Sequence, residues 1–135
     1  MSTSHHSKGQ SSLEFLTMFI LVLLVFSAFI SLFAEWQTAA VEADRERIAA
    51  TIADRVGFEL DRALVAGNGF SRTIELPEEI RGRNYTMQVM NGTVLLDYGP
   101  NTVRANTAVD QLAGPVKPGT NTIINDEGVI NVTQP

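Results

Sequence analysis

Residues 15–34 limit what this chain can fold into more than any other part of the sequence. Seventeen of these 20 residues are apolar, and only Thr17, Ser27 and Ser31 interrupt the run. As a helix the run would rise about 30 Å, which matches the hydrocarbon core of a bilayer. Hydroxyl groups can bond to carbonyls of the preceding helical turn, so these three cost little in lipid. The run, called the apolar block below, is predicted to lie in lipid or among other apolar helices.

The residues around the apolar block leave its interpretation open. A single-span anchor fits its length, and Trp36 stands where an interfacial aromatic residue belongs. A cleaved secretory signal has an apolar core of only about 7–15 residues, and the nearest small-residue cleavage site here is at residues 38–40. Lys8 precedes the block while Glu35, Glu42 and Asp44 follow it, which favours an N-terminus inside the cell and the bulk of the chain outside.

A third interpretation comes from residues 8–15, which read Lys-Gly-Gln-Ser-Ser-Leu-Glu-Phe. This segment closely resembles the class III signal peptide of archaeal type IV pilin-like proteins, in which a prepilin peptidase cuts after a glycine and leaves the apolar helix intact. The resemblance places cleavage between Gly9 and Gln10 and makes residues 1–9 a removed leader. The family often has Leu at the ninth mature position, where this chain has Met18.

Glu14 is the fifth residue of the chain that such cleavage would leave. In bacterial pilins the matching glutamate is thought to meet the N-terminal amine of a neighbouring subunit, and the resemblance implies that assembly role for Glu14. An unpaired carboxylate is costly to bury in an apolar environment, so a partner would be needed there. The alternative is that Glu14 lies hydrated in the headgroup region.

Downstream of the block, the sequence predicts that the same helix continues to residue 66. Residues 10–66 contain no proline and one glycine, Gly57, whereas all five prolines lie beyond. A stripe repeats every four residues, and charged residues of both signs cover the other face, which predicts a solvated surface opposite an apolar one. The stripe consists of Ile48, Ile52, Val56, Leu60 and Leu64.

Residues 67–135 are predicted to form an antiparallel sheet of about four to six strands, giving an α+β fold in which the long N-terminal helix packs on a small β-sheet domain. Asn91-Gly92 and the turn at residues 126–128 each mark a hairpin. The expected strands cover residues 70–76, 85–89, 94–98, 105–112, 123–124 and 129–132.

The chain offers little for catalysis or cofactor binding. It has no cysteine, and its two histidines, His5 and His6, would leave with the leader. Glu78 and Glu79 are neighbours in sequence and point apart, and residues 125–128 lack the ligand spacing of a calcium loop. We therefore expect no enzyme, metal or cofactor. Ten basic residues against 15 acidic ones, a net charge of −5, also argue against nucleic acid.

Three N-x-Ser/Thr sequons, at Asn84, Asn91 and Asn131, are candidate glycosylation sites. An Asn/Thr-rich strand surface without glycans would give the same pattern.

The sequence as a whole predicts a pilin-like structural subunit. The precursor would span the cytoplasmic membrane once with its N-terminus inside, and the mature chain would form a cell-surface filament that serves adhesion. The partners expected are copies of itself, a prepilin peptidase, an assembly ATPase and a membrane platform protein. The alternatives are a membrane-anchored accessory or receptor that does not polymerise, and a soluble secreted binding protein.

Overall fold

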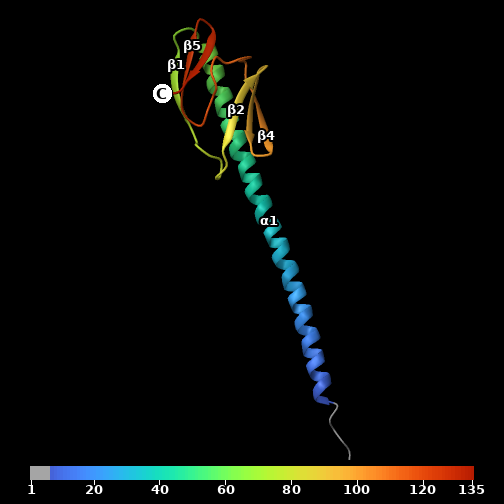
Figure 1. Cartoon of the computed structure of the whole chain (residues 1–135). Helices are drawn as coiled ribbons and strands as arrows, with labels where there is room; N and C mark the ends of the chain where they lie inside the picture. Colours follow the sequence, from blue (N-terminus) through green and yellow to red (C-terminus); the bar gives the residue numbers. More distant parts are fainter. Residues whose placement is uncertain (1–6) are drawn as a thin grey trace, which may run out of the picture. The chain divides into compact units, whose positions relative to one another are not determined.

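The computed structural model describes residues 7–135 and has the expected α+β fold, with one long helix and small antiparallel sheets (Figure 1). The chain divides into two compact units, one up to Glu42 and one from Ala43 onward. The helix α1 begins three residues before the predicted start and ends at the predicted residue. The elements are α1 (Ser7–Ala66), β1 (Ser71–Leu76), β2 (Tyr85–Met90), β3 (Thr93–Tyr98), β4 (Asn101–Asn106), β5 (Gly119–Asp126) and β6 (Val129–Thr133).

The end of α1 follows from the backbone requirements of the next residues. Gly67 and Gly69 have φ angles of 81° and 86°, in the left-handed region that glycine adopts without steric cost. The phenylalanine that follows is tied back by a hydrogen bond from Phe70 N to Gly67 O, 3.3 Å long. The change in composition at residue 66 therefore coincides with the end of the helix.

The apolar stripe of α1 is confirmed as one face of the core in the second unit. Ile52, Val56 and Leu60 are buried, while Ile48 and Leu64 at its two ends are partly buried. Small residues let the strands approach this face closely. The buried small side chains beside the stripe are Ala49, Ala53 and Ala63.

The prediction of a single sheet is wrong, because the strands form two three-stranded antiparallel sheets. Their orders are β1-β5-β6 and β2-β3-β4. Prolines lie in both segments that pass from one sheet to the other: Pro77 between β1 and β2, and Pro115 and Pro118 between β4 and β5. Proline cannot donate to a strand ladder, so these segments leave one sheet before the other begins.

Both predicted hairpin turns are confirmed. Asn91 and Gly92 have φ angles of 51° and 71° and join β2 to β3. Glu127 and Gly128, with φ angles of 52° and 89°, join β5 to β6 in the same way. Two successive residues with positive φ are what a tight hairpin turn of this hand requires.

The strand predicted at residues 105–112 is wrong, since β4 runs from Asn101 to Asn106. A two-residue turn, Gly99-Pro100, places Asn101 opposite Tyr98 and fixes the register of β4. The chain then leaves the sheet because Asp61 of α1 holds it: its Oδ1 accepts hydrogen bonds from Thr107 Oγ1 and Ala108 N, each 2.6 Å long.

The charged face of α1 is also less uniformly solvated than predicted. Glu59 is buried, and its carboxylate forms an ion pair with Arg72 of β1 at 3.2 Å. This contact explains why a charged residue interrupts the alternating pattern of that strand. Asp61 is the second exception, because it binds the loop after β4.

One core joins α1 to both sheets. Gly57 allows a close approach, since a Cβ built there would lie 2.9 Å from the carbonyl oxygen of Asn106 at the end of β4. In the other sheet, buried Asn125 donates from Nδ2 to the carbonyl of Ala63, 2.8 Å away. The side chain of Asn125 also accepts from Gly128 N at 2.9 Å, so it links the β5–β6 turn to the helix.

Candidate functional site

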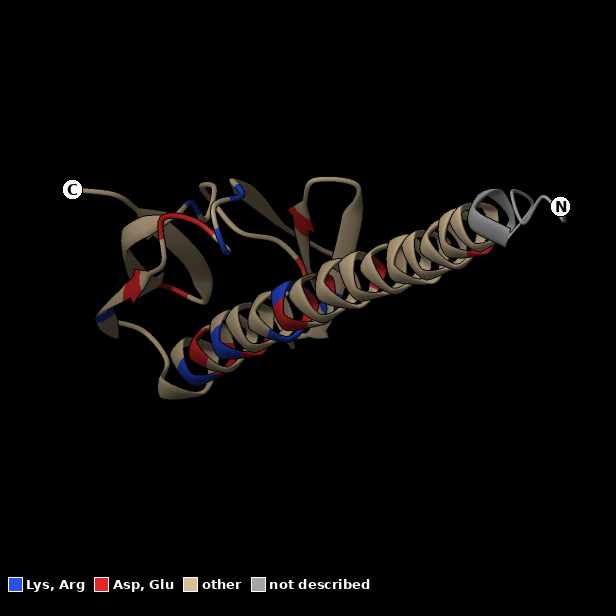
Figure 2. Ribbon diagram, turned by 90° about the horizontal axis from the view of Figure 1, so that it is seen from below, with Lys and Arg blue, Asp and Glu red and all other residues tan. Residues whose placement is uncertain are grey.

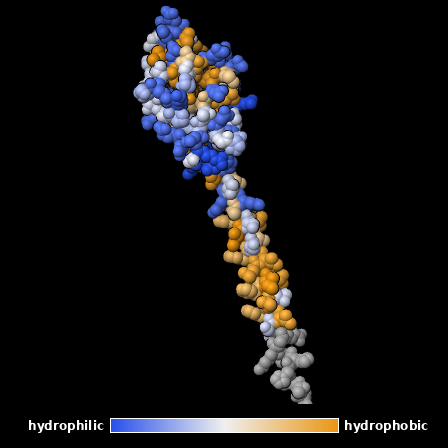
Figure 3. Space-filling view, in the orientation of Figure 1, coloured by the Kyte–Doolittle hydropathy of each residue, from blue (hydrophilic) through white to orange (hydrophobic). Residues whose placement is uncertain are grey.

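The apolar block presents its side chains to the surroundings on every side of the helix. Its large hydrophobic side chains are at least 50% exposed, and Phe15 reaches 74%. Figure 3 shows this part of α1 covered by hydrophobic surface on the face in view. Figure 2 shows its ribbon without charged residues, whereas charges of both signs crowd the later turns of the helix. A helix apolar around its whole circumference requires an apolar environment.

Two of the three hydroxyl groups in the block, and one just after it, bond to carbonyls of the preceding helical turn. Thr17 Oγ1 donates to Leu13 O at 2.9 Å, and Ser31 Oγ donates to Ser27 O at 3.2 Å. Thr38 Oγ1 makes the same contact with the carbonyl four residues before it, at 3.0 Å. By its length and composition, the helix is long and apolar enough to span a membrane.

The three residues predicted for processing and assembly lie in the first turns of α1. Gly9 and Gln10 fall inside the helix, although residues 1–6 of the predicted leader, His5 and His6 among them, lie outside the described residues. Glu14 is exposed one residue before the apolar block. Among the side chains of residues 11–135, none forms an ion pair with Glu14. All three positions therefore lie near the N-terminal end of α1.

The sequons occupy different environments in the second unit. Asn84 is exposed just before β2, and Asn91 is exposed in the β2–β3 turn. Asn131 is half-buried within β6, where it pairs with Ile124 and also bridges Ala113. Two of the three candidate acceptor side chains are therefore accessible on loops or turns, and the third is part of a sheet.

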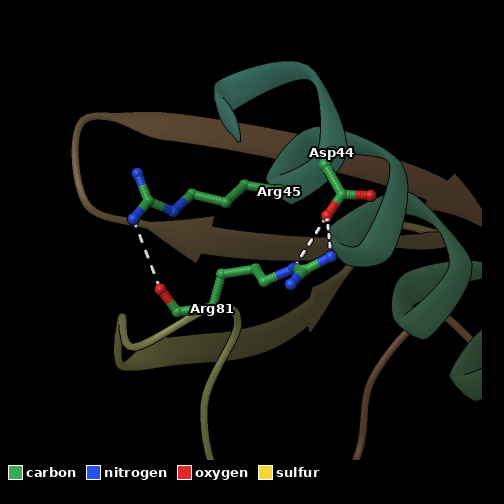
Figure 4. A network of polar contacts seen from close by, with 3 residues as sticks. All are labelled: Asp44, Arg45 and Arg81. Atoms are coloured by element: carbon green, nitrogen blue, oxygen red, sulfur yellow. Dashed lines mark hydrogen bonds and ion pairs between the residues drawn. The ribbon is translucent and has the colours of Figure 1, made fainter. Parts of the chain in front are cut away.

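A polar clamp joins α1 to the loop between β1 and β2 (Figure 4). Arg81 donates from Nε to Asp44 Oδ2 at 2.7 Å, and its Nη2 lies 2.5 Å from the same oxygen. Arg45 Nη2 donates to the carbonyl of Arg81 at 3.3 Å. Arg81 itself has a φ of 49° in a tight turn closed by Ile80 and Arg83. Sequence reasoning missed this clamp because its partners lie 37 positions apart.

Beside this clamp, a groove of about 340 Å³ lies between α1 and the end of β1. Its apolar lining is contributed by Ile48 and Ile52 from the helix and by Leu76 and Pro77 from the strand end. No sequence signal predicts the groove, because it depends on where β1 ends against the helix. The polar residues at the groove are Asp44, Arg47, Thr51 and Arg55.

Tyr85 gives the second unit a pH-dependent stability. Its side chain is buried at the start of β2, and its hydroxyl donates to the carbonyl of Pro77 at 2.5 Å. Burial, aided by the nearby carboxylate of Glu78, raises the pKa of Tyr85 from 10.0 to about 12.

The unfolded chain loses this phenolic proton near pH 10, while the folded chain keeps it to about pH 12. The unfolded state therefore binds fewer protons in this window, and we expect the free energy of unfolding to fall as the pH rises through it. Below about pH 10 the contribution of Tyr85 is complete. Urea unfolding in detergent across this range would measure the slope, and Tyr85→Phe is expected to remove most of it. An unchanged slope in Tyr85→Phe would contradict this role.

Among the described residues, no three His, Cys, Asp or Glu side chains are grouped so that they could hold a metal ion. The apolar block and the groove of the second unit are the two candidate sites among the described residues.

Comparison with known proteins identifies a family whose function is unknown. No curated protein and no solved structure matches the chain. A family model matches residues 12–131, which include the apolar block, β1 to β5, the first half of β6 and two complete sequons, those of Asn84 and Asn91. The protein therefore belongs to DUF7266, a family of unknown function.

Proposed function

We propose that this protein is a structural subunit of an archaeal type IV pilus-like surface filament. The observation that carries the proposal is the apolar block: it is exposed around its whole circumference and follows directly on Gly9, Gln10 and Glu14. A prepilin peptidase would cut the membrane-bound precursor between Gly9 and Gln10. The mature helices would then pack together as the filament core, with the sheets outside.

Burial of the apolar block would hold the assembled filament together in water, but it would not supply the work of leaving the bilayer. Apolar surface removed from water contributes about 25 cal/mol per Å². Lipid is as apolar as a neighbouring helix, so moving the block from the bilayer into a filament gains little from this effect. An assembly ATPase and a membrane platform protein would supply the work of extraction.

Glu14 would make the transfer selective for processed subunits. Cleavage after Gly9 creates a positively charged amine on Gln10, and this amine can pair with Glu14 of a neighbouring copy. A carboxylate moved into an apolar core without such a partner costs several kcal/mol. An uncleaved precursor has no amine at this position and would leave Glu14 unpaired.

The second unit would form the outer surface of the filament and provide adhesion. Its exposed sequons, Asn84 and Asn91, are proposed to carry N-glycans on this surface, because their side chains are accessible beside tight turns. Asn131 would be modified less, since it lies half-buried in β6.

Fractionation of sheared cells tests the proposed function. We expect the protein to be the major component of filaments released by shearing, as seen by electron microscopy and by mass spectrometry of the same fraction. Retention of all the protein in membranes, in cells that carry no filaments containing it, would overturn the proposal. It would favour the membrane-anchored accessory or receptor instead.

A further inference from the structure

The groove of the second unit combines an apolar floor with a basic rim. Ile52 and Leu76 are buried beneath it, while Arg47, Thr51 and Arg55 are exposed along its helical side. Its volume of about 340 Å³ falls within the range of clefts that bind small organic groups, about 300–1,000 Å³. A single large aromatic side chain would therefore fit it.

The charge at this groove is positive after its internal contacts are counted. The carboxylate of Asp44 is already held by Arg81 through two contacts of 2.5 and 2.7 Å. Among the described residues, neither Arg47 nor Arg55 has a carboxylate partner. The groove thus suits an apolar group that is flanked by a carboxylate.

The same chain exposes a segment with these properties. Residues 11–44 contain four charged side chains, all of them carboxylates. Trp36 is 74% exposed, and Glu35 directly precedes it and is also exposed. Trp36 continues the apolar face formed by Phe29, Leu32 and Phe33 on α1. Aromatic anchors of this kind carry much of the binding energy of protein interfaces.

We propose that Trp36 of one copy inserts into this groove of a second copy, with Glu35 facing Arg47 and Arg55. The inference rests on the proposed function and names a specific contact within the filament. The two members of the contact come from different units of the chain, Trp36 from the first and the groove from the second.

Cross-linking tests the proposed contact directly, because the chain contains no cysteine of its own. Gln37→Cys and Thr51→Cys, carried by separate copies in the same cells, leave Trp36 and both arginines intact. A short bismaleimide applied to sheared filaments is expected to give covalent dimers. The control pair, Gln37→Cys with Gln88→Cys on the exposed side of β2, is expected to give at least several-fold fewer dimers.

Charge exchange provides a second readout in the full-length protein. Glu35→Arg and Arg55→Glu are each expected to lower the filament yield several-fold, and the two together are expected to restore it. Filaments that form normally without the cross-link, or without any response to charge exchange, would overturn the contact and leave the proposed function standing. Absence of filaments from the wild-type strain would overturn both proposals, and cross-links confined to the membrane fraction would overturn the contact.

Discussion

Replacing Gly9 with valine is expected to leave the precursor uncleaved and to abolish the surface filaments. In the proposed function, Gly9 is the residue that a prepilin peptidase would read, because residues 8–15 resemble class III signal peptides. An uncleaved chain keeps residues 1–9, including the charged Lys8, and lacks the amine on Gln10. Glu14 would then have no partner in a filament core. Electron microscopy of cells and mass spectrometry of the membrane fraction would measure both effects.

Ser7→Val is the matched control for this variant. It places the same side chain two positions earlier in the predicted leader, and we expect normal cleavage and normal filaments. Filaments of uncleaved Gly9→Val protein would contradict the role of the amine. Loss of filaments from Gly9→Val cells whose protein is still cleaved after residue 9 would contradict the role of Gly9 in processing.

Leu60→Ala is expected to destabilise the second unit by about 2–5 kcal/mol, the usual cost of a cavity at a fully buried leucine. Leu60 is 0% exposed and belongs to the stripe that joins α1 to the sheets. A domain of this size has only about 5–15 kcal/mol of stability, so the loss is a large share of the total. Urea unfolding of the full-length protein in detergent would measure it.

Phe58→Ala is the matched control on the same helix. The phenylalanine is larger than leucine, but it is 65% exposed on the face of α1 away from the stripe. We expect its truncation to change the free energy of unfolding by less than about 0.5 kcal/mol. Equal destabilisation by the two variants would show that the stripe is not the core that holds the sheets.

Local patterns in the sequence predicted the elements of this fold well. The four-residue spacing of Ile52, Val56 and Leu60 identified the buried face of the helix, because helical periodicity alone determines which side chains share a face. The dipeptide Asn91-Gly92 identified a hairpin, since both residues adopt positive φ readily.

Features that depend on distant residues were not predictable in this way. The division into two sheets depends on the pairing of β1 with β5, whose residues lie more than 40 positions apart. The shifted β4 depends on the hold of Asp61 on Thr107, and the groove depends on where Leu76 meets the helix. Nothing in the spacing of these residues distinguishes them from ordinary surface positions. The candidate processing residues, Gly9 and Gln10, were identified from the resemblance of residues 8–15 to class III signal peptides. The fold of the chain does not identify them.

The mature N-terminus of the protein in sheared filaments is the most direct test of the pilin proposal. Mass spectrometry of that material is expected to find chains that begin at Gln10 and retain the whole apolar block. Chains that begin after residue 34, or that keep residues 1–9 in assembled filaments, would contradict it.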